Sequence, residues 1–163
     1  MIDYDKLSDA QLKIAAKVQK TARQMNLDPE YALAVAYQEN RFGHTTSPKG
    51  AIGPMQVMPD TAKELNIDPY NVDQNIYGGL KYLKQNLLKY DNDKLLAAIA
   101  YNAGPNHEFF KTRNYDLLPD ETLKYARDIN KIHPIMGTKP VAEAPAEPET
   151  PAPPATPPAP TAP

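Results

Sequence analysis

Glu39 is the residue of this sequence whose type and place most clearly suggest chemistry. It follows the almost wholly apolar stretch 31–38 and lies three, four and seven residues after Ala36, Val35 and Ala32. At helical spacing these positions share one face, which is meant for burial. Burial and the negative end of the helix dipole both raise the pKa of a carboxyl in the last turn of a helix. We therefore expect Glu39 to be a carboxylic acid that can donate a proton near neutral pH.

The helix that carries this glutamate has a clear beginning in the sequence. Asp28 is suited to cap it, and Pro29 is suited to its first position. The predicted helix therefore covers residues 29–39 and places Glu39 in its last turn. The alternative interpretation is a surface glutamate at a fraying helix end, because glutamates are rarely buried.

Several motifs follow Glu39 along the chain. They are GAIGPMQVMPDTA at 50–62, NIYGG at 75–79, AYNAGP at 100–105, and LPDET at 118–122 followed by Tyr125. In this order they resemble the catalytic domain of the soluble lytic transglycosylase family, the lysozyme-like enzymes that cleave peptidoglycan glycan strands. The resemblance covers roughly residues 8–132. It is specific for the family and does not identify an individual protein.

The resemblance implies a mechanism with one carboxyl group. In that family a single Glu acts first as acid and then as base, and the 6-hydroxyl of the same muramic acid sugar traps the intermediate as a 1,6-anhydro end. By resemblance Glu39 takes both roles. A retaining hydrolase would need a second carboxylate about 5 Å away, and the sequence holds no acidic residue between Arg41 and Pro59.

Two other functions remain open. One is a hydrolase of the goose-type lysozyme kind, with the same fold and acid but with water as the attacking group. The other is a weakly active virion or structural module that binds peptidoglycan. The reducing end of the product distinguishes the first alternative, and replacement of Glu39 by Gln distinguishes the second.

Further site residues follow from the same motifs. The predicted substrate-binding residues are Asn40, Met55, Gln56, Tyr101, Asn102 and Tyr125. Five of them also have a structural interpretation: loop packing for the Met-Gln pair, a core tyrosine for Tyr101, a helix-end cap for Asn102, and a buried tyrosine with a structural hydrogen bond for Tyr125. The family usually has Ser where this chain has Asn40, and often Leu where it has Pro54. Those two departures leave the role of Asn40 open and predict a stiffer loop at Pro54.

Composition predicts one domain and a tail. Residues 139–163 contain ten of the eighteen prolines and seven alanines, and their only aliphatic side chain larger than alanine is Val141. Such a segment cannot bury enough apolar surface to fold. We therefore predict a lysozyme-like lytic transglycosylase domain over 1–138 and a disordered, extended Pro/Ala-rich tail over 139–163, which is free to contact an unidentified protein.

The pattern of apolar residues predicts an all-α fold of the lysozyme-like α+β superfamily. The predicted helix at 8–25 is expected to bury Leu12, and the one at 73–90 is expected to bury Leu88. The loop 50–59 has too many Gly and Pro for a helix and leaves room for a short extended turn. The predicted helices cover 8–25, 29–39, 61–65, 73–90, 93–102 and 119–132.

Charge and composition restrict the partners. The tail holds one Lys and three Glu of the chain's 18 basic and 20 acidic residues, which leaves 17 of each in residues 1–138. A neutral domain argues against nucleic acid, since phosphate binding usually requires a basic excess. Nothing in the sequence approaches a membrane-spanning apolar run. The expected partner is peptidoglycan, and the chain is expected to be a monomer.

No metal or cofactor is expected. The three histidines, His44, His107 and His133, are too scattered for a metal site. The chain has no cysteine, which leaves its redox compartment undefined. Residues 1–6 lack the layout of a secretory signal, although the expected substrate lies in the periplasm or cell wall. A trimmed signal, release by lysis and carriage in a phage particle each explain this, and phage association is favoured.

Overall fold

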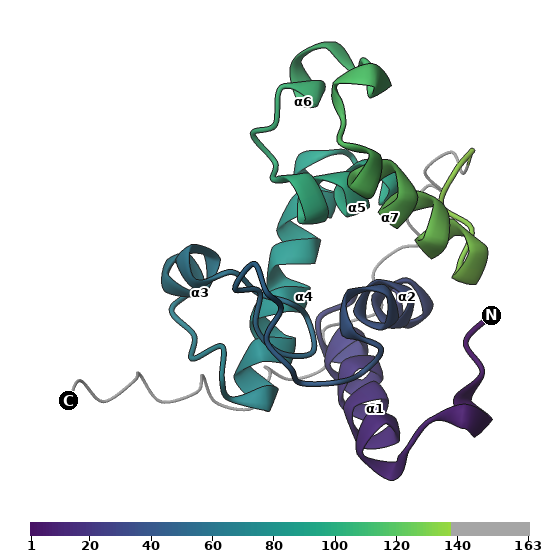
Figure 1. Ribbon diagram of the computed structural model, residues 1–163, viewed down its shortest axis with the longest axis vertical. Helices are drawn as coiled ribbons and strands as arrows, with labels where there is room; N and C mark the ends of the chain where they lie inside the picture. Colours follow the sequence, from purple (N-terminus) through teal and green to yellow (C-terminus); the bar gives the residue numbers. More distant parts are fainter. Residues whose placement is uncertain (138–163) are drawn as a thin grey trace. The chain divides into compact units, whose positions relative to one another are not determined.

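The computed structural model describes residues 1–137, and these form helices joined by loops (Figure 1). The predicted all-α architecture is confirmed for this part of the chain. The predicted tail, 139–163, lies outside the described residues. The elements are η1 (Tyr4–Lys6), α1 (Asp9–Gln24), α2 (Pro29–Asn40), α3 (Pro59–Leu65), α4 (Val72–Lys89), α5 (Lys94–Ala103), α6 (Phe109–Thr112), η2 (Tyr115–Leu117) and α7 (Asp120–Ile132).

The described residues divide into two compact units. The N-terminal unit comprises residues 2–81, and the C-terminal unit comprises residues 82–137 together with Met1. The division falls within α4, which contributes its first part to one unit and its second part to the other. Each unit contains buried apolar side chains and its own share of the predicted site residues.

In the N-terminal unit, α1 is fixed at its beginning by a capping box. The Ser8 hydroxyl accepts from the Gln11 backbone, and the Gln11 carboxamide oxygen accepts from the Ser8 backbone. One stripe of the helix is buried, at Ile14, Ala15, Val18 and Ala22. The prediction that Leu12 joins this stripe was wrong, because it is 38% exposed. Leu12 lies about 200° around the helix from Ile14.

α2 lies beside α1 in the same unit (Figure 1). The Asp28 carboxylate accepts from the backbone N–H groups of Glu30 and Tyr31, and Pro29 is the first helical residue, as predicted. Six consecutive residues, 31–36, are buried. The helix is therefore buried on all sides here, whereas the sequence pattern had indicated one buried face.

Two helix predictions in the 59–90 region need correction. α3 begins at Pro59, two residues before the predicted start, because proline is tolerated at the first helical position. In α4 the buried stripe contains Ile76, Leu80, Leu83 and Leu87. Leu88 is 65% exposed instead, because it lies about 100° from Leu87 around the helix.

The C-terminal unit is built on two helices that lie side by side, α5 and α7 (Figure 1). Asp93 caps α5, and Gly104 ends it at a φ of 92°. Between α5 and α7 the chain forms α6 and η2, which the sequence pattern did not predict because both are very short. One cluster of its buried core is made by Ile99, Phe109, Leu118 and Ala126.

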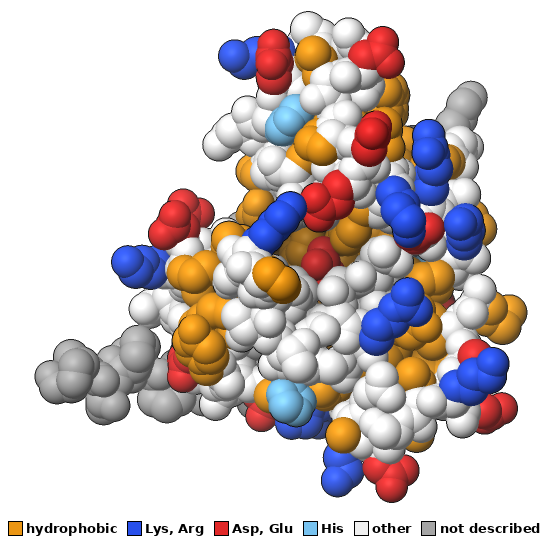
Figure 2. All heavy atoms as spheres, in the orientation of Figure 1, with side chains coloured by type: hydrophobic (Ala, Val, Ile, Leu, Met, Phe, Trp, Pro, Cys, Tyr) orange, Lys and Arg blue, Asp and Glu red, His pale blue; other side chains and the backbone are white. Residues whose placement is uncertain are grey.

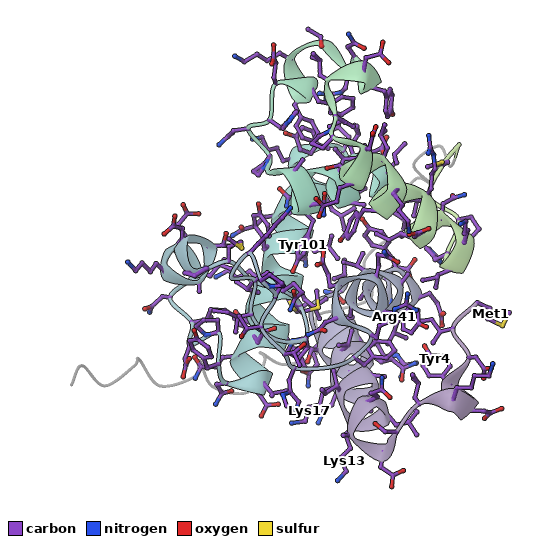
Figure 3. The ribbon with its side chains drawn as sticks, viewed as in Figure 1. Met1, Tyr4, Lys13, Lys17, Arg41 and Tyr101 are labelled. Atoms are coloured by element: carbon purple, nitrogen blue, oxygen red, sulfur yellow. The ribbon has the colours of Figure 1, made fainter. Side chains whose placement is uncertain are left out.

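Charged side chains of both signs stand on the molecular face drawn in Figure 2. In the N-terminal unit the Lys17 ammonium, labelled in Figure 3, pairs with Asp73 at 2.7 Å. Within residues 1–137 no helix combines the length and apolar character needed to cross a membrane.

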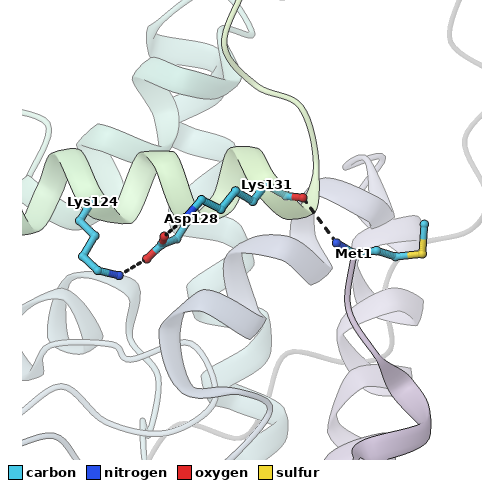
Figure 4. Close-up of polar contacts among 4 residues, drawn as sticks. All are labelled: Met1, Lys124, Asp128 and Lys131. Carbon is cyan, nitrogen blue, oxygen red and sulfur yellow. Dashed lines mark hydrogen bonds and ion pairs between the residues drawn. The ribbon is translucent and has the colours of Figure 1, made fainter.

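One ionic cluster lies on α7 in the C-terminal unit (Figure 4). Asp128 accepts from the Lys124 ammonium and from that of Lys131, the second at 3.4 Å. The hydrogen bond from Lys124, helped by Lys131, holds the pKa of the Asp128 carboxyl below its ordinary value. The amino group of Met1 donates to the Lys131 carbonyl at 3.4 Å.

Candidate active site

Glu39 lies in the last turn of α2, as predicted, and its side chain is half-buried. The residues one helical turn and two turns before it, Val35, Ala36 and Ala32, are fully buried. The carboxyl therefore lies where a buried helix ends. A carboxyl in such a place is partly shielded from water and can still reach a ligand.

The chain turns sharply just after this carboxyl. Arg41 and Phe42 both have left-handed backbone conformations, with φ of 53° and 60°. The Arg41 guanidinium lies over the Tyr37 ring and donates to its hydroxyl at 2.7 Å. The Arg41 carbonyl accepts from the side chain of Gln11 at 2.9 Å. These contacts hold the C-terminal end of α2 within its own unit.

A loop follows from 43 to 58 and folds back on itself. Ile52 bridges Thr46 on one side and Val57 on the other. The Ile52–Val57 pair exchanges two backbone hydrogen bonds, of 3.0 and 2.9 Å. Gly50 has a φ of 91°, a conformation that glycine adopts without strain. The predicted short extended turn is confirmed.

Two predicted site residues donate to the same pair of backbone carbonyls in this loop. The Asn40 Nδ2 group lies 3.1 Å from the Thr45 oxygen and 3.1 Å from the Gly53 oxygen. The Gln56 Nε2 group lies 3.0 and 2.9 Å from the same two oxygens. Both side chains are half-buried. The carboxamides of Asn40 and Gln56, with their two shared carbonyls, are called the carboxamide brace below.

A third carboxamide, that of Asn75 on α4, holds the loop from the other side. Its oxygen accepts from the Met55 N–H at 2.9 Å, and its nitrogen donates to Ile52 at 2.7 Å and Pro69 at 2.9 Å. Asn75 is completely buried. A Cβ at Gly53 would lie 2.6 Å from the Asn75 nitrogen, so only glycine permits this close approach.

Met55, which was predicted to line the sugar site, is also completely buried. Its backbone N–H, as described, is bonded to Asn75. The side chain is therefore enclosed by protein, directly before Gln56 in the loop. Its predicted contact with substrate stays a prediction.

The C-terminal unit holds the other three predicted residues on α5 and α7. Tyr101 is buried, and its ring lies 5.3 Å from that of Tyr82. Tyr125 is buried on α7. The Asn102 oxygen accepts from the Thr122 hydroxyl at 2.8 Å, and Thr122 is only 2% exposed. In this arrangement the carboxamide oxygen of Asn102 faces Thr122, and its NH₂ group is directed elsewhere.

The structure thus gathers Asn40, Gln56 and the backbone of Met55 around one loop that follows Glu39. It places Tyr101, Asn102 and Tyr125 together on two packed helices of the other unit. Within residues 1–137, no group of three or more His, Asp or Glu side chains is arranged to hold a metal ion.

The sequence analysis gave no role to two residues that shape these sites, Asn75 and Thr122. Asn75 immediately precedes the buried Ile76 on an amphipathic helix, and such a polar residue beside a buried stripe could have been noticed. Thr122 lies within the LPDET motif, yet nothing in that motif indicates its partner 20 residues earlier.

Comparisons with known proteins agree with this architecture. Residues 16–122 match the family described as "Transglycosylase SLT domain". The transglycosylase of Enterobacteria phage PRD1 is 37% identical over 127 residues, which cover 74% of this chain and 48% of the phage protein. The soluble lytic murein transglycosylase of Salmonella typhimurium is 36% identical over 95 residues, which cover 51% of this chain and 15% of that protein.

A solved structure shares the fold. The inactive mutant of the lytic transglycosylase Slt from Pseudomonas aeruginosa superposes with a TM-score of 0.61 at 26% identity, over 72% of this chain and 22% of that one. This likeness confirms the predicted lysozyme-like helical fold. The chain spans less than half the length of these relatives. The family match covers most of the described residues, and the chain therefore belongs to the transglycosylase SLT domain family.

Proposed function

We propose that this chain is a peptidoglycan lytic transglycosylase. It cleaves the β-1,4 bond between N-acetylmuramic acid and N-acetylglucosamine and leaves a 1,6-anhydromuramic acid end. The observation that carries the proposal is the place of Glu39, half-buried at the end of a buried helix and followed by a tightly held loop without acidic residues. The family of the chain and the names of its relatives support the same reaction.

In this proposal Glu39 acts twice. As the acid it gives its proton to the glycosidic oxygen, and the bond to the muramic acid C1 breaks through an oxocarbenium-like transition state. The carboxylate then takes the proton from the 6-hydroxyl of the same sugar while that oxygen bonds to C1. The proton returns to Glu39, and no water is consumed. The tethered hydroxyl competes well with water because its effective concentration is high.

The predicted substrate contacts belong to the same proposal. Gln56 and Met55 supply the loop that follows the acid, and the Asn102 NH₂ group is a donor for a sugar oxygen once Thr122 occupies its carbonyl end. Tyr101 and Tyr125 supply phenols from α5 and α7. No cofactor or metal takes part.

Replacement of the acid tests the proposal. Glu39→Gln keeps the shape of the side chain and removes the acidic proton of the carboxyl group. It should therefore reduce turnover by at least about a hundredfold. The matched control is Glu30→Gln, an exposed glutamate in the first turn of the same helix, which should keep full activity. Circular dichroism checks that both variants fold. Equal clearance of peptidoglycan suspensions by the wild type and Glu39→Gln would refute the role of Glu39.

Mass spectrometry of the products separates the transglycosylase from a hydrolase. The anhydro end is lighter than a free reducing end by one water, because the 6-hydroxyl has replaced water as the attacking group. Digests of purified sacculi should contain anhydro ends from the first minutes of reaction. Free reducing ends alone would favour the goose-type hydrolase.

We also propose that the enzyme acts in the cell wall as part of a phage particle or after release by lysis. The phage PRD1 relative supports this, since it is a phage protein called a transglycosylase. Detection of the chain in purified virions by mass spectrometry, with peptidoglycan-clearing activity in the same particles, tests the first route. The predicted monomer and the predicted protein contact of the tail stay predictions.

A further inference from the structure

Within the carboxamide brace, Asn40 uses both N–H donors of its side chain. Backbone carbonyls only accept hydrogen bonds, so the Asn40 group that faces Thr45 and Gly53 has to be its NH₂ end. Its oxygen in turn accepts from the Thr45 hydroxyl at 3.2 Å. Both hydrogens of the Asn40 NH₂ group are therefore engaged within the protein, and none is left for a sugar.

The second member strengthens the same attachment. Gln56 donates to the two carbonyls that Asn40 already uses, and each carbonyl oxygen has two lone pairs to accept them. Gln56 reaches them from a left-handed backbone conformation, with φ of 49°, which is uncommon outside glycine. A conformation of this kind persists only where the surrounding contacts enforce it.

Asn40 is also the residue that directly follows Glu39, and it is the last residue of α2. Helix ends fray because their final carbonyls lack partners inside the helix. At this end the side chain of the last residue is fixed to two loop carbonyls, one of them 13 residues further along. The bonds of the Asn40 side chain keep this last turn from fraying, and Glu39 shares the helical backbone of that turn.

We propose that Asn40 is a positioning residue for Glu39. Together with Gln56 it fastens the loop 43–58 to the last turn of α2, and so it sets the direction in which the carboxyl points. This inference rests on the proposed function, because it gives Glu39 a catalytic task. It assigns to Asn40, where the family usually has Ser, a role in geometry and not in sugar binding.

Asn40→Leu tests the inference, because Leu keeps the branched shape of Asn and removes its hydrogen bonds. We expect kcat on soluble peptidoglycan strands to fall by about tenfold to a hundredfold, with the apparent KM within about twofold, as for a misplaced catalytic group. The limbs of the kcat–pH profile should also shift. Asn40→Ser, which restores one donor, should recover part of the loss.

Two comparisons keep the result specific. Gln24→Leu removes an exposed carboxamide from the last turn of α1 in the same unit, and it should leave kcat unchanged. Gln56→Leu should lower kcat, and the double variant with Asn40→Leu should lose less than the product of the two single effects, because both belong to one brace. A kcat and a pH profile equal to those of the wild type in Asn40→Leu would overturn the proposal.

A measurement that does not depend on turnover distinguishes failure of the positioning role of Asn40 from failure of the proposed function. The ¹³C resonance of the Glu39 carboxyl, observed in labelled full-length chain, should move and broaden in Asn40→Leu and not in Gln24→Leu. A wild-type chain that produces no anhydro ends refutes the function. A wild type that produces them, with an unchanged Glu39 resonance in Asn40→Leu, refutes the positioning role alone.

Discussion

The loop 43–58 of the N-terminal unit and the α5–α7 pair of the C-terminal unit hold predicted site residues by different means. The loop depends on the side-chain amides of Asn40, Gln56 and Asn75, which bond to its backbone. The α5–α7 pair depends on apolar packing around Ile99 and Phe109. A loop lacks the regular hydrogen bonds of a helix, so its backbone groups need partners from elsewhere.

This difference predicts how each unit responds to substitution. Hydrogen bonds are directional, so the loss of one amide should change the shape of the loop as well as its stability. Apolar packing is less directional, so loss of volume between α5 and α7 should cost stability and leave the helices in place. A substitution between α5 and α7 should therefore lower stability and leave the geometry unchanged. A substitution of a loop amide should change both together.

The largest effect is expected at Asn75. Asn75→Leu leaves the Met55 N–H and the Pro69 carbonyl without this partner and the Ile52 carbonyl with the Val57 N–H alone, which should cost about 3–5 kcal/mol of unfolding free energy. The folded fraction should also lose turnover, because the loop changes shape. Urea denaturation and kinetics per folded molecule measure the two effects.

Phe109→Ala is the control from the other unit. It should cost a similar amount, about 3–5 kcal/mol, through loss of packing at a fully buried ring. Its turnover per folded molecule should stay near that of the wild type. Wild-type turnover in folded Asn75→Leu would contradict the proposed difference between the two units, because neither variant would then change the geometry of its site.

A smaller effect is expected where the C-terminal unit uses its own polar contact. Thr122→Val removes the hydroxyl that orients the Asn102 carboxamide, at a cost of about 1 kcal/mol. The freed amide can rotate, so the apparent KM should rise by about fivefold while kcat changes little, since about 1 kcal/mol corresponds to that factor. Thr122→Ser should restore the KM. In an Asn102→Ala background Thr122→Val should have no further effect on KM, and a full additional effect there would show that Thr122 acts by another route.

The smallest effect is expected at the ion pairs of Asp128 on α7. The lowered pKa of Asp128 means that its ion pairs stabilise the fold above the ordinary carboxyl pKa of about 4 and lose this effect as the pH falls through the lowered value. Asp128→Asn should therefore be less stable than the wild type at pH 7 by less than about 1 kcal/mol. The difference in stability should shrink as the pH falls below about 4 and vanish once Asp128 is protonated in the folded protein. Thermal unfolding from pH 2 to 7 measures this, and a difference that grows on acidification would contradict it.

Local signals in the sequence were sufficient for most of the helices. Asp28 and Asp93 each begin a helix by bonding to N–H groups two or three residues away, and such contacts can be predicted from neighbouring residues alone. Gly104 likewise ends α5 at a positive φ. The wrong positions, Leu12 and Leu88, are apolar residues that lie off the buried stripes, where composition gives no warning.

The site was less predictable because its contacts are not local. Asn75 reaches Ile52 across 23 residues, and no periodic pattern connects the two. For the same reason the sequence motifs drew attention to Gln56 as a sugar contact and gave no indication that its donors face two loop carbonyls. Motifs identify which side chains matter, while the fold decides which of their atoms remain available.

The small buried side chains of α2 limit which substitutions this domain can tolerate. Three of its six consecutive buried residues are alanines, at positions 32, 34 and 36, and all three are fully enclosed. A larger side chain at any of them would have to push the helix sideways, and the carboxyl at its end would travel with it. The positions that least tolerate a larger side chain should thus be alanines, which have no reactive atoms. A mutational scan for inactive variants should therefore find substitutions at these alanines as well as at the acid.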